Sequence, residues 1–276
     1  PGTLLGDRLR FWRATLAGLP DEHGLRTDRP RPEVPSYAGE SLPFTLGAGL
    51  HARLTALARA QGATLFMVLQ AGLAALLARS GAGSDVVLGS PIAGRGDPRL
   101  DGLIGLFANT VVLRTPVAGD AAFTELLARV RETDLAAYAH QEMPFEQLVE
   151  LLNPPRVPGR HPLFQIGFAV QNAPAARFRL AGLDVRPAAV PTATSRFDLF
   201  FSMTGKTAED GTSAGITGAV EYSTELFDEG TVRGLVDRWR RLLEAVAEDP
   251  ARAVDAIELM SAAEREKLLL DWAQGD

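Results

Sequence analysis

The sequence predicts an α/β protein in which helices cover a mixed β-sheet, giving a two-layer sandwich. Helical patterns come first along the chain, and a run of short apolar strands follows later. That order is typical of a mixed sheet covered by helices. No strong linker interrupts the chain. We therefore expect one compact unit with a C-terminal extension.

The chain begins with a predicted N-terminal helix and an extended strap. A helical period runs over residues 6–17, and Gly18 and Pro20 end it. Three prolines between residues 26 and 40 exclude a helix there and favour an extended strap over the surface.

The remaining elements follow from alternation, amphipathic periods and punctuating glycines and prolines. We expect helices at 50–60, 65–79, 120–139, 144–152, 228–248 and 261–273, and strands at 42–46, 85–91, 104–114, 163–171, 184–190, 197–204 and 215–222. The last two strands flank the polar stretch GKTAEDGTSAG at 205–215, which predicts a hairpin with a long loop.

Composition excludes several classes of function. The net charge of −6 gives no basic field for nucleic acid. The absence of cysteine removes disulfides, thiolate nucleophiles and Cys-type metal sites, and the four scattered histidines argue against a His-rich metal site. The apolar stretch 63–78 is too short to span a membrane. With no signal peptide visible, we expect a cytoplasmic setting.

The familiar catalytic motifs also fail. GKT at 205–207 is not a P-loop, because Phe200 stands where the first glycine belongs. The sequence holds no G-x-G-x-x-G, H-E-x-x-H or G-x-S-x-G. In HQEMPFEQLVE at 140–150, His140 could fix a turn by hydrogen bonds, while Glu142 and Glu146 could favour a helix dipole. The chain therefore shows no self-sufficient catalytic constellation.

Several segments together resemble the condensation domain of nonribosomal peptide synthetases. They are RFWRATLAGLP with TDRPRP, GSPIAGRGDPRLDGLIGLFANTVVLR at 89–114, HQEMPFEQLVE, RHPLFQIGFAVQN at 160–172, RFDLFFSM and VEYSTELFDEGTV. The family signature H-H-x-x-x-D-G lies in the first lobe, and no histidine here is followed by an acid four residues later. The resemblance therefore covers the C-terminal lobe of a chloramphenicol acetyltransferase-like fold, at residues 1–258. Within it, residues 1–40 are the N-terminal helix and strap, and 259–276 begin a linker toward an adenylation domain.

The resemblance implies the function. Such domains join an acyl or aminoacyl thioester to an acceptor amine, each carried on the phosphopantetheine arm of a carrier protein, with no bound cofactor or metal. The partners implied are the missing N-terminal lobe, peptidyl or acyl carrier proteins and the adenylation domain, with no nucleic acid and no membrane. The lobe alone is expected to be inactive and to expose apolar surface where the first lobe would pack. A non-catalytic module that docks a carrier protein or adenylation domain, an epimerase-like or heterocyclising relative, and a CoA-dependent acyltransferase are alternatives.

The resemblance also assigns residues, none of them catalytic. The floor of the reaction tunnel would be lined by Pro91, Ala93, Gly94, Arg95, Phe107 and Asn109. The structural motif would comprise His140, Gln141, Pro144, Phe145, Glu146 and Arg160, and a latch toward the other lobe would contain Gly205, Lys206, Gly211 and Gly215.

Two of these roles stay open in the sequence. Asn109 could satisfy a bulge or face the tunnel, because a buried amide needs partners. Arg95 could pair with the aspartate of the missing signature, or locally with Asp97 or Asp101.

Overall fold

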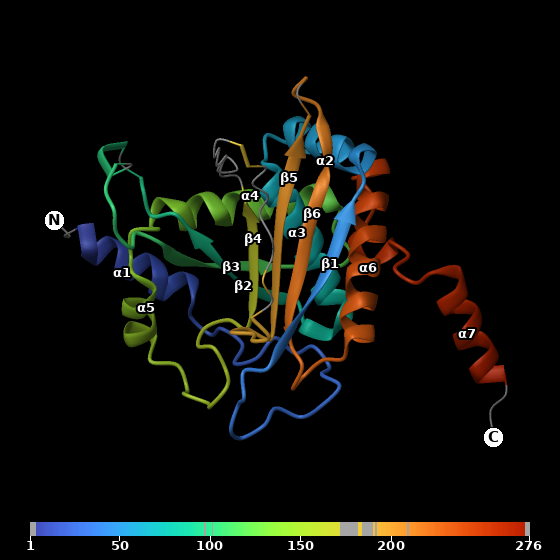
Figure 1. Cartoon of the computed structure of the whole chain (residues 1–276), viewed down its shortest axis with the longest axis horizontal. Coiled ribbons are helices and arrows are strands. Elements are labelled where there is room, and N and C mark those ends of the chain that lie inside the picture. The colour runs from blue at the N-terminus through green and yellow to red at the C-terminus, as the bar shows by residue number, and fades with distance from the viewer. Residues whose placement is uncertain are drawn as a thin grey trace.

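The computed structural model describes residues 4–96, 98–100, 102–171, 182–183, 190, 192–208 and 210–273. Over these residues the chain forms a mixed sheet with a layer of helices packed behind it (Figure 1). The predicted α/β class and the two-layer arrangement are therefore confirmed.

The sheet has six strands over the described residues, in the order β1-β6-β5-β4-β2-β3. Their bounds are β1 Gly39–Leu46, β2 Asp85–Ile92, β3 Asn109–Pro116, β4 Ile166–Gln171, β5 Leu199–Thr207 and β6 Ser213–Ser223. β4 runs parallel to both β2 and β5, and the other neighbouring strands are antiparallel. The centre of the sheet thus brings together three strands that are distant in the chain.

The helices divide into a covering layer and three outlying helices. Their bounds are α1 Leu4–Thr15, α2 Ala48–Ala60, α3 Leu65–Leu77, α4 Phe123–Ala139, α5 Phe145–Leu152, α6 Glu229–Glu248 and α7 Ala262–Ala273, with short helical turns η1 Ala78–Ala82, η2 Pro98–Leu100 and η3 Val254–Ala256. α2, α3, α4 and α6 form the covering layer, α1 and α5 pack together beside β3, and α7 points away from the body (Figure 1).

α3 is the centre of the core. Every residue from 67 to 77 is buried. Thr64 caps the helix as predicted, with its Oγ1 accepting from the Met67 N–H at 3.2 Å. α6 crosses so closely at Gly72 that a Cβ there would lie 2.6 Å from Leu243 Cδ2. The apolar stretch that was expected to be too short for a membrane continues as helix to Ala82, so Leu65–Ala82 is long and apolar enough to cross one. However, 61% of it is buried inside the molecule, which is typical of a core helix.

Two predicted elements differ from the structure. The strand expected over 104–114 begins only at Asn109, and residues 102–108 are irregular. The hairpin does not have a long loop, because β5 continues to Thr207 and β6 starts at Ser213, leaving a tip at 208–212. The strand predicted over 184–190 falls, except for residue 190, outside the described residues.

Candidate functional site

The loop between β2 and β3, residues 93–108 and here called the floor loop, folds back on itself at Gly94. This glycine has a φ of +65°, a left-handed conformation that glycine adopts without strain. A Cβ at Gly94 would lie 1.8 Å from the carbonyl oxygen of Phe107. The outgoing and returning backbones therefore touch here, and no other residue fits.

Arg95 holds the floor loop from within. Its Nη2 donates to the Leu103 carbonyl at 2.9 Å, and its Nη1 donates to the Leu100 carbonyl. The guanidinium carbon lies 4.3 Å from the centroid of the Phe107 ring, which is an attractive cation–π contact. These contacts make Arg95 a stabilising residue of this loop.

The two pairings that the sequence left open for Arg95 are not decided by these contacts. The local candidates, Asp97 and Asp101, lie outside the described residues. The other candidate is an aspartate of the first lobe, whose signature this sequence does not hold.

Asn109 joins the floor loop to the turn between α4 and α5, residues 140–144, here called the motif turn. Its Nδ2 donates to the carbonyls of Gln141 and Met143, at 2.9 and 2.8 Å. Its Oδ1 accepts from the Phe145 N–H at 3.0 Å and so caps α5, where Pro144 provides no side-chain cap. The amide thus satisfies the motif turn rather than a bulge.

Replacing Asn109 should therefore weaken the whole site. We expect Asn109→Ala to lower the free energy of unfolding by about 2–3 kcal/mol, because two carbonyls and one N–H lose a partner. Asn109→Asp should lower the free energy of unfolding by at least as much. It keeps the acceptor for the Phe145 N–H, but it places a carboxylate oxygen against the carbonyl oxygens of Gln141 and Met143. Urea unfolding at neutral pH measures both, and an aspartate variant as stable as the wild type would contradict this role.

His140 is placed by stacking rather than by hydrogen bonds of its side chain. Its ring lies parallel to Phe11 of α1, with 4.0 Å between the centroids. Its carbonyl accepts from Trp12 Nε1 at 3.2 Å, and its buried Nδ1 has no hydrogen-bond partner. The sequence predicted that His140 fixes this turn by hydrogen bonds. In the structure its carbonyl accepts from Trp12 and from the Met143 N–H, while its ring stacks on Phe11.

The acids of the motif turn have separate surroundings. Glu142 lies before α5, outside its first turn, and pairs with Arg8 of α1. Glu146 occupies the first turn of α5, as predicted, and is exposed. α1 therefore holds the motif turn through Phe11, Trp12 and Arg8.

A depression of ≈ 810 Å³ lies between the floor loop and the motif turn. It is lined by Gly94, Gly96, Leu100, Phe107, Ala108, Asn109, Gln141, Glu142, Pro144 and Glu146. Three predicted floor residues and three predicted motif residues thus meet here, whereas Pro91, Ala93 and Arg95 do not line it. Among the described residues, the lining holds no histidine, serine or cysteine, and no cluster of His, Cys, Asp or Glu could hold a metal ion. The described part of the lining therefore surrounds a space large enough for a substrate but supplies no nucleophile–base pair.

An aromatic cluster connects the start of α5 to the sheet, and sequence reasoning missed it. His161 contacts Phe145, Phe164 and Phe197, at centroid distances of 5.4, 4.4 and 4.9 Å, and Phe200 continues the cluster from Phe197 at 5.7 Å. The sequence did contain one sign of this cluster, the glycines at positions 89 and 167, where an aromatic ring packs directly against the backbone. A Cβ on Gly89 would lie 2.0 Å from the Phe164 ring, and one on Gly167 would lie 2.3 Å from the Phe200 ring.

A buried carboxylate pins the strap to the start of β5, and this too was missed. Asp198 is 4% exposed, accepts two hydrogen bonds from Arg31, and receives His23 Nε2 at 3.0 Å. The Leu25 N–H donates to His23 Nδ1 at 3.0 Å, so Nε2 is the nitrogen that donates to Asp198. These three side chains, Asp198, Arg31 and His23, are here called the clasp.

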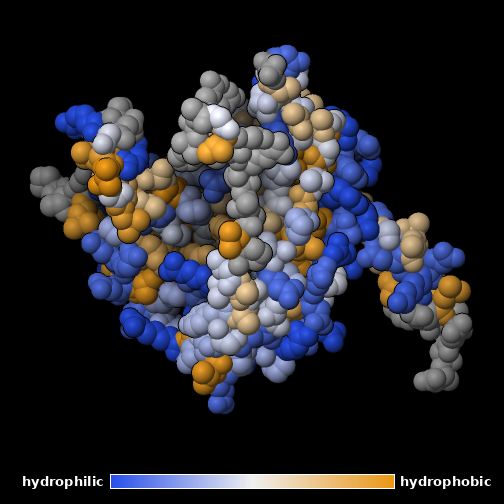
Figure 2. All heavy atoms as spheres, in the orientation of Figure 1, coloured by the Kyte–Doolittle hydropathy of each residue, from blue (hydrophilic) through white to orange (hydrophobic). Residues whose placement is uncertain are grey.

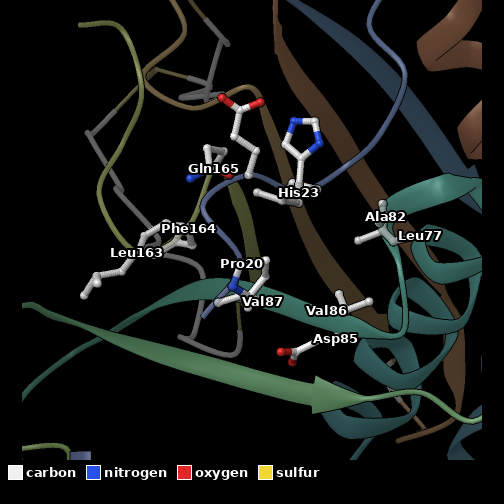
Figure 3. A pocket seen from close by; sticks show the side chains of 12 residues that line it. Pro20, His23, Leu77, Ala82, Asp85, Val86, Val87, Leu163, Phe164 and Gln165 are labelled. Atoms are coloured by element: carbon white, nitrogen blue, oxygen red, sulfur yellow. The ribbon is translucent and has the colours of Figure 1, made fainter. Parts of the chain in front are cut away.

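Beside the clasp lies a cavity that is too small for a ligand (Figure 3). Its volume is ≈ 10 Å³, about enough for one water molecule. Figure 3 shows Pro20 beside Val87 of β2, while His23 and Gln165 line another part of the cavity. Nearby, Arg160 of the structural motif pairs with Glu22 at 3.0 Å. Arg160 therefore serves the packing of the strap and lies away from the depression.

The predicted latch is the outer end of the β5–β6 hairpin. Gly205 and Lys206 belong to β5, Gly215 belongs to β6, and Gly211 turns the tip with a φ of +81°. His51 of α2, 6% exposed, lies under the hairpin, because a Cβ on Gly205 would meet its ring at 3.5 Å. The latch residues thus gather at one place, apart from the depression.

The fold and this site define the class of protein. The model of the condensation domain family matches residues 4–269. The chain is 53% identical, over 99% of its length, to a probable non-canonical nonribosomal peptide synthetase (CymA) of Salinispora arenicola, and 47% identical to a dimodular nonribosomal peptide synthase of Bacillus subtilis. The chain belongs to the condensation domain family of nonribosomal peptide synthetases. It spans 3% and 11% of those two relatives.

Solved structures agree with this assignment. The X-domain from teicoplanin biosynthesis is 37% identical, with a TM-score of 0.87 over 94% of this chain and 58% of that chain. All of this chain also aligns with 22% of a four-domain nonribosomal peptide synthetase bound to AMP and glycine, with a TM-score of 0.83. At 24% identity, that match supports the fold alone.

Proposed function

We propose that the chain is the C-terminal, acceptor-side lobe of a peptide-bond-forming condensation domain and acts in the cytoplasm. The observation that carries the proposal is coverage. The chain aligns with 54–58% of condensation-type chains such as the teicoplanin X-domain and the first condensation domain of the CDA synthetase. In those chains the remainder is of about the size of a second lobe.

An unpartnered apolar surface supports the same proposal. In the floor loop, Leu103, Ile104 and Leu106 are 52, 105 and 92% exposed. Figure 2 shows hydrophobic residues gathered over this loop and the adjoining part of α1. Apolar surface of this kind is typical of an interaction site, and the first lobe is the partner that the family implies.

The proposed reaction joins two tethered substrates. The acceptor amine attacks the carbonyl of the donor thioester, the C–N bond forms, the C–S bond breaks, and the phosphopantetheine thiol leaves with the proton that the amine loses. Holding both reactants in position supplies much of such a rate enhancement. This lobe would provide the wall of the tunnel through the depression, and the first lobe would provide the histidine. The isolated lobe is therefore expected to be inactive.

A second candidate function is a non-catalytic interaction module. An X-domain 38% identical to this chain was solved in a complex with OxyB in teicoplanin biosynthesis. By analogy, this chain would bind a protein partner, and the partners that the family implies are a carrier protein and an adenylation domain.

Complementation distinguishes the two functions. The chain is mixed with a matching first lobe and two loaded carrier proteins, and peptidyl transfer is followed by intact-protein mass spectrometry. Product only in the full mixture would support the condensation lobe. Association of the lobes without product would favour the interaction module, and product from this chain alone would contradict the proposal.

Two glycine variants serve as a matched pair in that assay. Gly94→Ala should abolish product, because its Cβ cannot fit beside the Phe107 carbonyl and the floor loop must move. Gly102→Ala adds the same methyl group to the same loop, outside the lining of the depression and with nothing within 4 Å, and should keep product formation near the wild-type level. Equal activity of the two variants would show that the depression is not part of the tunnel.

A further inference from the structure

The segment that follows α6 is built onto the body of the molecule. The Phe123 N–H donates to the Arg252 carbonyl at 3.1 Å, and the Val254 N–H donates to the Ala121 carbonyl at 3.0 Å. Val254 and Ile257 are buried. Arg79 donates to both of their carbonyls. The chain is therefore held firmly until it approaches α7.

The first turn of α7 is held by one carboxylate. Glu264 Oε2 accepts from the Ser261 N–H at 2.6 Å, and the Glu264 N–H donates to Ser261 Oγ at 3.1 Å, which together form a capping box. From α6, Arg241 Nη1 lies 3.1 Å from Oε2 and Arg238 Nη2 lies 3.3 Å from Oε1. Arg241 also donates to the Leu259 carbonyl, just before the helix.

The rest of α7 extends away from the body, as Figure 1 shows. Leu268, Leu269 and Leu270 are 42, 59 and 55% exposed. Figure 2 shows hydrophobic side chains on this outlying helix. Since consecutive helical residues are about 100° apart, three leucines in a row spread over more than half of the circumference. The direction of α7 therefore depends on its first turn.

We propose that Glu264 is a fixed joint, which ties the N-terminus of α7 to α6 and sets the direction in which the helix leaves the body. A single exposed ion pair contributes only about 0–1 kcal/mol. Here one carboxylate is bound by a backbone N–H and by two arginines, so both of its oxygens are fixed from different directions. The Ser261 N–H, the Ser261 hydroxyl and the two arginines outweigh partial burial and lower the pKa of Glu264 to about 2, so it stays ionised.

The joint would set the position of whatever part of a synthetase follows. α7 is about 18 Å long, from about 1.5 Å per residue. A rotation of about 20° at its base would therefore move its far end by about 6 Å. This inference concerns the chain itself and holds whether or not the chain takes part in condensation.

The absence of cysteine in the sequence allows a direct test. Spin labels are attached through Glu244→Cys on α6 and Lys267→Cys on α7, both exposed positions, and their distance distribution is measured by pulsed electron spin resonance. The otherwise unchanged chain should give one narrow distribution. Glu264→Gln keeps the capping box but loses the charge. Its distribution should widen by roughly 5 Å, because position 267 lies about 7.5 Å along a helix that is then free to swing.

Two further variants make the test specific. Glu266→Gln makes the same change two residues along the same helix and should leave the distribution narrow. Arg238→Ala removes one partner without touching the capping box and should widen it by less than Glu264→Gln does. A broad distribution before any change at position 264, or a narrow one in Glu264→Gln, would overturn the proposal.

Discussion

Replacing Asp198 with asparagine should lower the free energy of unfolding by about 3–5 kcal/mol, the range expected when one partner of a buried ion pair is removed. The asparagine side chain could accept only through one oxygen, and its NH₂ would face the donors of Arg31 and His23. The Arg31 side chain is 18% exposed, so its charge would lose its counter-ion where water can replace it only in part. Urea unfolding monitored by tryptophan fluorescence gives the difference.

The same carboxylate should produce an acid-sensitive stability. Burial alone would raise the pKa of Asp198, but the hydrogen bonds from His23 and Arg31 outweigh it and hold the pKa below its usual value. A depressed folded-state pKa contributes stability that is present above about pH 4 and is lost as the pH falls further. Asp198→Asn should therefore remove part of the acid dependence of unfolding.

The matched control is a pair that is exposed on both sides. Glu229, at the start of α6, is 56% exposed and pairs with Arg233, whose side chain is 58% exposed. Glu229→Gln should change the free energy of unfolding by less than about 1 kcal/mol, as is usual for exposed pairs. If the two substitutions cost the same, the clasp does not behave as a buried ion pair.

Elements with a strong local period could be predicted almost to the residue. The predicted helix over 228–248 is observed as Glu229–Glu248, because a single amphipathic stripe sets both its ends and its buried face. The strand expected over 104–114 was wrong in its first half because its apolar residues were taken to be buried. Ile104 and Leu106 are instead exposed, and Gly102 and Gly105 break the strand pattern.

The candidate site could be predicted only where the family resemblance assigned its residues. Gly94, Asn109 and Gln141 line one depression. They could be predicted because the resemblance covered both the floor loop and the motif turn. The clasp could not be found in this way. Its histidine and arginine lie 175 and 167 positions from Asp198, and no local pattern marks such pairs. They meet because the tract between α1 and β1, which holds His23 and Arg31, passes the start of β5.

A second buried acid lies in the helical layer, between α3 and α4. Asp134 is fully buried, and Gln70 Nε2 donates to its Oδ1 at 2.9 Å. The other oxygen of Asp134 and the Oε1 of Gln70 have no hydrogen-bond partner. Burial raises the pKa of Asp134 to about 7, against the opposing hydrogen bond from Gln70. A proton on Asp134 would supply a donor where two unpartnered oxygens now lie.

Asp134→Asn should therefore stabilise the protein at neutral and alkaline pH. A raised folded-state pKa contributes stability that is fully present below the unfolded pKa and is lost as the pH rises through the folded pKa. Between about pH 4 and pH 7 the wild type should lose about 1.4 kcal/mol per pH unit, on the order of 4 kcal/mol in all. The asparagine variant, which is neutral throughout, should not lose this stability.

The expected result is a difference in the free energy of unfolding between Asp134→Asn and the wild type that grows as the pH rises. Chemical unfolding of wild type and Asp134→Asn should nearly coincide at pH 4 and separate progressively up to about pH 7, with the variant more stable. Asp237→Asn, an acid on α6 whose side chain is 41% exposed, should show no such growth. A constant offset between wild type and Asp134→Asn at every pH would mean that the substitution changes packing rather than charge. A variant less stable than the wild type at pH 8 would mean that Asp134 is needed as a carboxylate in the core.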